Sequence, residues 1–82
     1  MNHYEELGLE RSATTGQIRS AYRNLARLLH PDQQRDEELR RLAEVQMRRL
    51  NFIHAVLADP ERRSQYDASL LTSAIRSGGA IT

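Results

Sequence analysis

Pro31 separates two segments of this 82-residue chain whose apolar residues recur at the spacing of an α-helix. Proline lacks an amide hydrogen and disfavours helical geometry at the residue before it, so the first segment must end near His30. Only a few residues lead to the second segment, and this short connection predicts two antiparallel helices with facing apolar stripes. The stripes are Ile18, Ala21, Leu25, Leu28 and Leu29 in the first helix, and Leu39, Leu42, Ala43, Met47, Leu50, Ile53 and Leu57 in the second.

Capping patterns give the starts of both helices. Thr14 and Gln17 have the spacing of a capping box, and residues 15–29, which follow, contain neither proline nor an acidic residue. Asp36 is a suitable N-cap for the second helix, because the next two residues are glutamates and the helix dipole favours negative charge there. We therefore expect helices over residues 15–29 and about 37 to 57.

A short helix is predicted at the start of the chain, over about residues 2–7. Asn2 can cap it, with Glu5 three residues on as the reciprocal capping partner. Gly8 can end it in a left-handed turn, because glycine has no side chain to oppose that conformation.

A second short helix is predicted after Asp59 and Pro60, which form a cap and first-position pair, and it should end at about Tyr66. We expect residues 1–68 to form one domain, and residues 69–82 to be a tail or the start of a linker, either flexible or a short helix. The expected fold class is all-α, with the short first and fourth helices packed at the ends of the antiparallel hairpin.

Val45, Phe52 and Val56 lie on the side of the third helix that faces away from its main stripe. The simplest interpretation is that they pack against the first or fourth helix. Two other hypotheses are that Phe52 marks a second contact surface, or that it is covered by the tail residues Leu70, Leu71 or Ile75.

The composition indicates a soluble protein in a reducing compartment. The chain has no cysteine, so it contains neither a disulfide nor a thiolate metal site. It also lacks the run of about 20 apolar residues that a membrane span needs, and its first residues lead directly into charged ones rather than into a signal peptide. We expect a cytoplasmic protein with no membrane contact in this segment.

Three arginines lie on the outer side of the second helix. Arg19, Arg23 and Arg27 recur at four-residue spacing, and like charges at this spacing repel one another by a few tenths of a kcal/mol per pair. One interpretation is a solvated face whose long side chains cover the helix surface. The other is a partner-binding face, which the His30-Pro31-Asp32 turn favours because it displays an imidazole and a carboxylate directly after the stripe.

His30 and Asp32 could also be interpreted as an acid–base or metal-binding pair. No third ligand and no serine or cysteine nucleophile has a supporting motif, so we expect no enzyme activity, no metal and no cofactor. The other histidines have simpler interpretations, His3 as a surface residue near the terminus and His54 as a residue at the edge of the apolar stripe.

A nucleic-acid-binding helix-turn-helix is the main alternative class, because an arginine-rich helix could approach phosphates. The formal net charge of only +1 and the low share of aromatic residues, 5%, argue against it. We therefore expect no nucleic-acid partner.

An ordered series of motifs resembles the J domain of the DnaJ family of co-chaperones, over Asn2 to about Asp67. The His-Pro-Asp tripeptide alone would occur by chance, but the order of the whole series is specific. The series is Tyr4-Glu5-Glu6-Leu7-Gly8-Leu9, Ile18-Arg19, Ala21-Tyr22-Arg23, Leu25-Ala26, His30-Pro31-Asp32, Asn51, Val56-Leu57, Asp59-Pro60-Glu61-Arg62-Arg63 and Tyr66-Asp67.

The resemblance implies a four-helix module that binds a DnaK-type heat-shock chaperone and stimulates its ATP hydrolysis. By position, Arg19 and Arg23 would meet an acidic surface of the chaperone's ATPase domain, Arg27 lies on the same face, and Tyr22 would add an aromatic contact. His30, Pro31 and Asp32 would form the trigger, with the aspartate engaging an arginine near the interdomain linker. The module would be a monomer and would reach unfolded client proteins only indirectly or through other regions.

The chain departs from the family pattern at several positions of this surface. Asn24 and Leu28 stand where lysine or arginine is usual, and His54 stands where tyrosine is common. Gln33 and Gln34 replace a basic residue and an asparagine after the tripeptide. A J-like scaffold that binds a partner without stimulating its ATPase is therefore a further alternative, against which the intact tripeptide argues.

Overall fold

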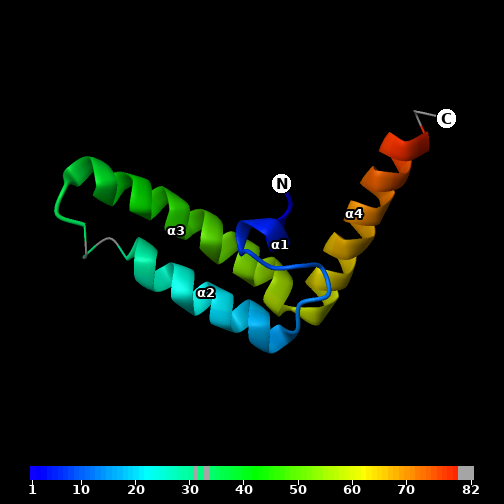
Figure 1. Cartoon of the computed structure of the whole chain (residues 1–82), viewed down its shortest axis with the longest axis horizontal. Helices are drawn as coiled ribbons and strands as arrows, with labels where there is room; N and C mark the ends of the chain where they lie inside the picture. The colour runs from blue at the N-terminus through cyan, green and yellow to red at the C-terminus, as the bar shows by residue number, and fades with distance from the viewer. Residues whose placement is uncertain (31, 33, 80–82) are drawn as a thin grey trace.

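The computed structural model describes residues 1–30, 32 and 34–79, with side chains as far as Ser73. Four helices are present in these residues, and no strand: α1 (His3–Glu6), α2 (Thr15–Leu29), α3 (Glu37–Ala58) and α4 (Pro60–Gly79). The all-α prediction is confirmed. Figure 1 shows α2 and α3 side by side as an antiparallel hairpin, with α1 against one end of it and α4 projecting away from the end of α3.

The predicted caps of the long helices are present. Thr14 Oγ1 accepts a hydrogen bond from the Gln17 amide at 3.1 Å, and Gln17 Oε1 accepts one from the Thr14 amide at 2.8 Å. Asp36 Oδ1 accepts from the Glu38 amide at 2.7 Å, and Asp59 Oδ1 from the Glu61 amide at 2.9 Å. These bonds satisfy amides that have no partner inside their own helices.

The short helix α1 is also capped, although its reciprocal bond differs from the prediction. Asn2 Oδ1 accepts from the Glu5 amide at 2.9 Å, as expected. The Glu5 carboxylate, however, accepts from the Asn2 side-chain amide at 3.3 Å rather than from its backbone. Gly8 has φ of 74°, which confirms the left-handed turn at the end of α1.

The buried core lies where α1 covers the hairpin. Its members come from α1, the loop after it and both long helices: Tyr4, Leu7, Ala13, Ile18, Leu50, Ile53 and Leu57. The predicted stripes are wrong at the other end of the hairpin, because Leu28, Leu39 and Leu42 are 71%, 51% and 57% exposed. With only four residues, α1 does not extend over that end, so these leucines keep much of their surface exposed.

Hydrogen bonds of buried and half-buried side chains join the first turns of α4 to α1 and the loop after it. The Tyr4 hydroxyl donates to Asp67 Oδ1 at 2.5 Å and accepts from Arg63 Nε at 3.0 Å. Arg63 also donates to the carbonyl of Ala13 at 2.6 Å, and the Tyr66 hydroxyl accepts from the His3 amide at 2.8 Å. Burial and the hydrogen bond to Asp67 raise the pKa of the Tyr4 phenol.

His3 is not the surface residue that the sequence suggested. Its ring stacks on Tyr66 with centroids 4.3 Å apart, and lies perpendicular to the Phe52 ring with centroids 5.7 Å apart. The side chain is only 13% exposed. Phe52 therefore packs against α1, which was the simplest expectation for it, while 55% of its surface stays exposed.

Helix α4 is much longer than the sequence suggested. It was expected to end at about Tyr66, but it continues to Gly79. No proline follows Pro60, and residues 68–75 include alanine and leucine, which favour helix. Leu70 packs against the core cluster and gives the extension a tertiary contact, whereas Leu71 is exposed. The side chain of Ile75 lies outside the described residues, so its contact with Phe52 stays a prediction.

The packing of Leu70 against the core should contribute to stability, whereas the exposed side chain of Leu71 should not. We expect Leu70→Ala to lower the free energy of unfolding by about 1 to 2 kcal/mol, because a partly buried leucine leaves a cavity when truncated. Leu71→Ala, the matched control one residue further on, should change it by less than about 0.5 kcal/mol. Urea unfolding followed by circular dichroism measures both, and equal effects would contradict the packing described for α4.

Glu6 makes a two-point ion pair with α3. Its Oε1 and Oε2 lie 3.2 and 2.9 Å from Arg49 Nε and Nη2. These hydrogen bonds lower the pKa of the Glu6 carboxyl below its ordinary value of 4.5. The unfolded state therefore takes up the proton first, so the stability from this pair is present above pH 4.5 and is lost as the pH falls through the lower, folded-state pKa.

We expect the melting temperature of the wild type to exceed that of Glu6→Gln near neutral pH, and this difference to shrink at low pH. A series of thermal melts from about pH 6 to about pH 3 measures it. Glu10→Gln, which changes an exposed carboxylate with no described partner, is the control and should follow the wild type throughout. A difference that does not depend on pH would show that Glu6 does not contribute through its charge.

Candidate partner-binding site

The outer side of α2 carries a continuous positive charge. Arg19, Arg23 and Arg27 are all exposed, and within the described part of the chain none of them forms an ion pair. The helix itself contains no acidic residue, and its apolar side is the one that faces α1 and α3. These three guanidinium groups, called the cationic face below, are therefore available to a partner.

Tyr22 lies beside the cationic face, at the seam between α2 and α3. Its hydroxyl donates to Asn51 Oδ1 at 2.7 Å, and its ring stacks on His54 with centroids 4.1 Å apart and planes 24° from parallel. The tyrosine is half-buried, so part of its surface stays accessible. Two residues of α3 thus hold a side chain that the sequence analysis assigned to partner contact.

The turn after α2 displays a carboxylate. His30 ends the helix in an extended conformation with φ of −62° and ψ of 121°, as expected for a residue before proline. The Asp32 amide donates to His30 Nδ1 at 3.3 Å, and Asp32 Oδ2 lies 3.7 Å from the same nitrogen. The Asp32 side chain is nevertheless 89% exposed. Pro31 lies outside the described residues.

The bond from the Asp32 amide restricts the state of the imidazole. Nδ1 can accept a hydrogen bond only when it carries no proton, so this contact places the proton of a neutral His30 on Nε2. The neutral imidazole then forms a hydrogen bond with the backbone of the turn and does not neutralise the Asp32 carboxylate. His30 therefore contacts the backbone of the turn, and the Asp32 side chain stays exposed.

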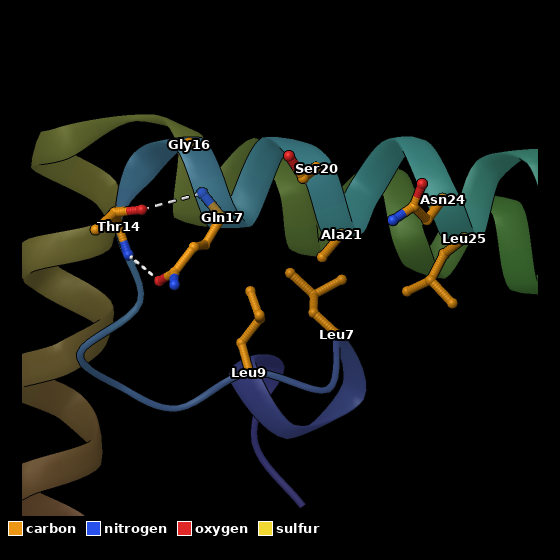
Figure 2. A pocket seen from close by; sticks show the side chains of 9 residues that line it. All are labelled: Leu7, Leu9, Thr14, Gly16, Gln17, Ser20, Ala21, Asn24 and Leu25. Carbon is orange, nitrogen blue, oxygen red and sulfur yellow. Dashed lines mark hydrogen bonds between the residues drawn. The ribbon is translucent and has the colours of Figure 1, made fainter.

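A shallow groove of about 690 Å³ lies between α2 and the segment that contains the end of α1. Figure 2 shows Leu7 and Leu9 pointing toward Ala21 and Leu25 of α2, with the Thr14 and Gln17 capping bonds at one end. Its lining is Leu7, Leu9, Thr14, Gly16, Gln17, Ser20, Ala21, Asn24 and Leu25, so the groove contains no acid–base group.

Other kinds of site find little support in the described residues. No group of three or more histidine, cysteine or acidic side chains is placed to hold a metal ion there, and His30 and Asp32 supply only two ligands. None of the helices in the described part of the chain combines the length and the apolar character needed to cross a membrane.

The structure brings together most of the residues singled out in the sequence. Arg19, Tyr22, Arg23 and Arg27 lie on α2, and His30 and Asp32 follow directly after it. Sequence reasoning missed the contacts of Tyr22 with Asn51 and His54, which lie 29 and 32 positions further along the chain. Finding them would require the register of the two helices, which periodicity alone does not give.

Comparison with known proteins agrees with this architecture. Residues 2–67 match the sequence model of the DnaJ domain. The chain is 46% identical over 71 residues to DnaJ homolog subfamily C member 1 of Mus musculus, an alignment that covers 87% of this chain and 12% of that protein. It is 42% identical over 79 residues to Chaperone protein DnaJ of Leifsonia xyli, covering 96% of this chain and 20% of that protein.

The hairpin domain therefore belongs to the DnaJ domain family, and the resemblance seen in the sequence is confirmed. The chain spans only about 12% to 20% of the length of these relatives. What it shares with them is the sequence of the DnaJ domain.

Proposed function

We propose that this chain is a co-chaperone module that binds a DnaK-type chaperone and stimulates its ATP hydrolysis. The observation that carries the proposal is the exposed Asp32 carboxylate on a braced turn, directly after a helix whose outer arginines have no described acidic partner. Membership of the DnaJ domain family over residues 2–67 supports the assignment of the partner. The proposed location is the cytoplasm, and the proposed state is a monomer.

The cationic face is proposed to attract the chaperone and to align its acidic surface with α2. Arg19, Arg23 and Arg27 project from one rigid helix, and guanidinium groups make planar, multidentate contacts with carboxylates. An acidic surface on the chaperone's ATPase domain would meet them in sequence along the helix. Because these charges are exposed, their attraction is long-range but sensitive to salt.

Asp32 is proposed to act once the partner is in place. An exposed carboxylate on a turn whose backbone amide is bonded to His30 is suited to receive an arginine near the chaperone's interdomain linker. The chain supplies no group to the reaction itself. It accelerates hydrolysis only if it binds the hydrolysis-competent state of the chaperone more tightly than the other state, and each tenfold stimulation needs about 1.4 kcal/mol of that difference.

Replacing the carboxylate should abolish stimulation while leaving the fold intact. We expect Asp32→Asn to remove most of the acceleration of single-turnover ATP hydrolysis by a DnaK-type chaperone, because the amide cannot form the charge-assisted contact. Its melting temperature should match that of the wild type, since the side chain is 89% exposed. Glu10→Gln serves as the control for loss of one carboxylate. Equal stimulation by Asp32→Asn and wild type would mean that the role of Asp32 is wrong.

Reversing the cationic face should prevent complex formation. We expect the triple variant Arg19→Glu, Arg23→Glu and Arg27→Glu to weaken binding to the chaperone by at least about tenfold at low ionic strength, with a smaller effect at high salt. The triple variant Arg11→Glu, Arg41→Glu and Arg48→Glu, which reverses three exposed arginines outside α2, is the control for net charge. Titration by fluorescence anisotropy measures the affinities, and unchanged binding of the α2 triple variant would contradict the electrostatic part of the proposal.

A further inference from the structure

We propose that Asn51 and His54 are positioning residues, which hold the Tyr22 ring in the orientation in which its accessible part meets the partner. The proposal rests on the function proposed above and extends the binding site from α2 onto α3. It assigns a role to two residues that lie outside the cationic face and the turn.

The contacts on Tyr22 fix the ring at two points. Asn51 holds the hydroxyl at the far end of the ring at 2.7 Å, and His54 covers one ring face at a centroid distance of 4.1 Å. Asn51 and His54 are three residues apart on α3, so their side chains are neighbours on the helix surface. An end contact combined with a face contact opposes rotation about both side-chain torsions of the tyrosine.

Tyr22 lies on α2 close to the cationic face. Arg19 lies three residues before it, so the two side chains are neighbours on the helix surface, and a partner that meets Arg19 also lies close to Tyr22. A side chain that is already ordered loses less conformational freedom on binding than one that must choose a rotamer. The arrangement fits a partner surface in which an apolar patch is bordered by carboxylates.

Asn51 and His54 lie outside the buried core. The largest fully buried side chains are Tyr4, Ile18, Ile53 and Leu57, whereas His54 is half-buried, Asn51 is exposed, and Tyr22 is half-buried and packs against the core cluster. An exposed hydrogen bond contributes little to folding because water can replace it, yet it still selects one orientation of the ring. Loss of Asn51 or His54 should therefore affect partner binding more than stability.

A double-mutant cycle tests whether Asn51 and His54 act through Tyr22. The measurement is the concentration of the chain that gives half-maximal stimulation of ATP hydrolysis by a DnaK-type chaperone. We expect Asn51→Ala and His54→Ala each to raise this concentration by about 2- to 10-fold without changing the maximal rate. In a Tyr22→Ala background, the same two substitutions should have no further effect. Equal effects in both backgrounds would overturn the proposal.

Two further variants serve as controls for the double-mutant cycle. His54→Tyr keeps an aromatic ring against Tyr22 and should retain the wild-type concentration dependence, so a loss equal to that of His54→Ala would contradict stacking as the cause. Gln46→Ala removes an exposed amide from the same helix, away from Tyr22, and should behave as the wild type. Melting temperatures of all variants identify any loss that comes from unfolding.

A measurement on the free chain separates this inference from the proposed function. In NMR spectra assigned with a Tyr22→Phe variant, we expect the Tyr22 ring to occupy one χ1 rotamer in the wild type and to average over several in the Asn51→Ala, His54→Ala double variant. A single rotamer in both would overturn the positioning role. If the wild type does not stimulate the chaperone at all, the proposed function fails, and the rotamer measurement still decides what Asn51 and His54 do.

Discussion

The packing of α1 onto the hairpin is the contact on which the rest of the molecule depends. Tyr4 and Leu7 are buried against Ile18 of α2 and Leu50 of α3, so a helix of four residues closes the core of two much longer ones. Tyr4 also links the hairpin to α4, because its hydroxyl bonds both Arg63 and Asp67. A chain of this length can bury only a small core, and concentrating it under α1 holds three elements together at one place.

This arrangement separates the residues that stabilise the domain from those that are proposed to bind. The buried Ile18 of α2 belongs to the core cluster, and Arg19, Arg23 and Arg27 are exposed and form no ion pair within the described residues. The turn with Asp32 lies at the end of the hairpin that α1 does not reach. Tyr22 belongs to both sets of residues, because residues of α3 hold its ring while part of the tyrosine stays accessible.

Much of the fold followed from local patterns. The capping box at Thr14 and the N-cap at Asp36 marked the starts of α2 and α3 correctly, because a cap is an interaction among neighbours in the sequence. The surface position of the arginines followed from periodicity in the same way. Errors arose where distant contacts decide: His3 is stacked against Tyr66, and α4 continues beyond Tyr66 with Leu70 against the core.

The sequence by itself determined the presence of four helices, the order of the motifs and the chemistry of the exposed groups, since each depends on residues a few positions apart. Only the tertiary structure decided which end of the hairpin is covered and which residues hold Tyr22. Leu28 and Leu25 have similar places in the apolar pattern, yet Leu28 is exposed and Leu25 packs against the core. The physical reason is that burial depends on the reach and register of a second element, which a periodic pattern in one helix does not contain.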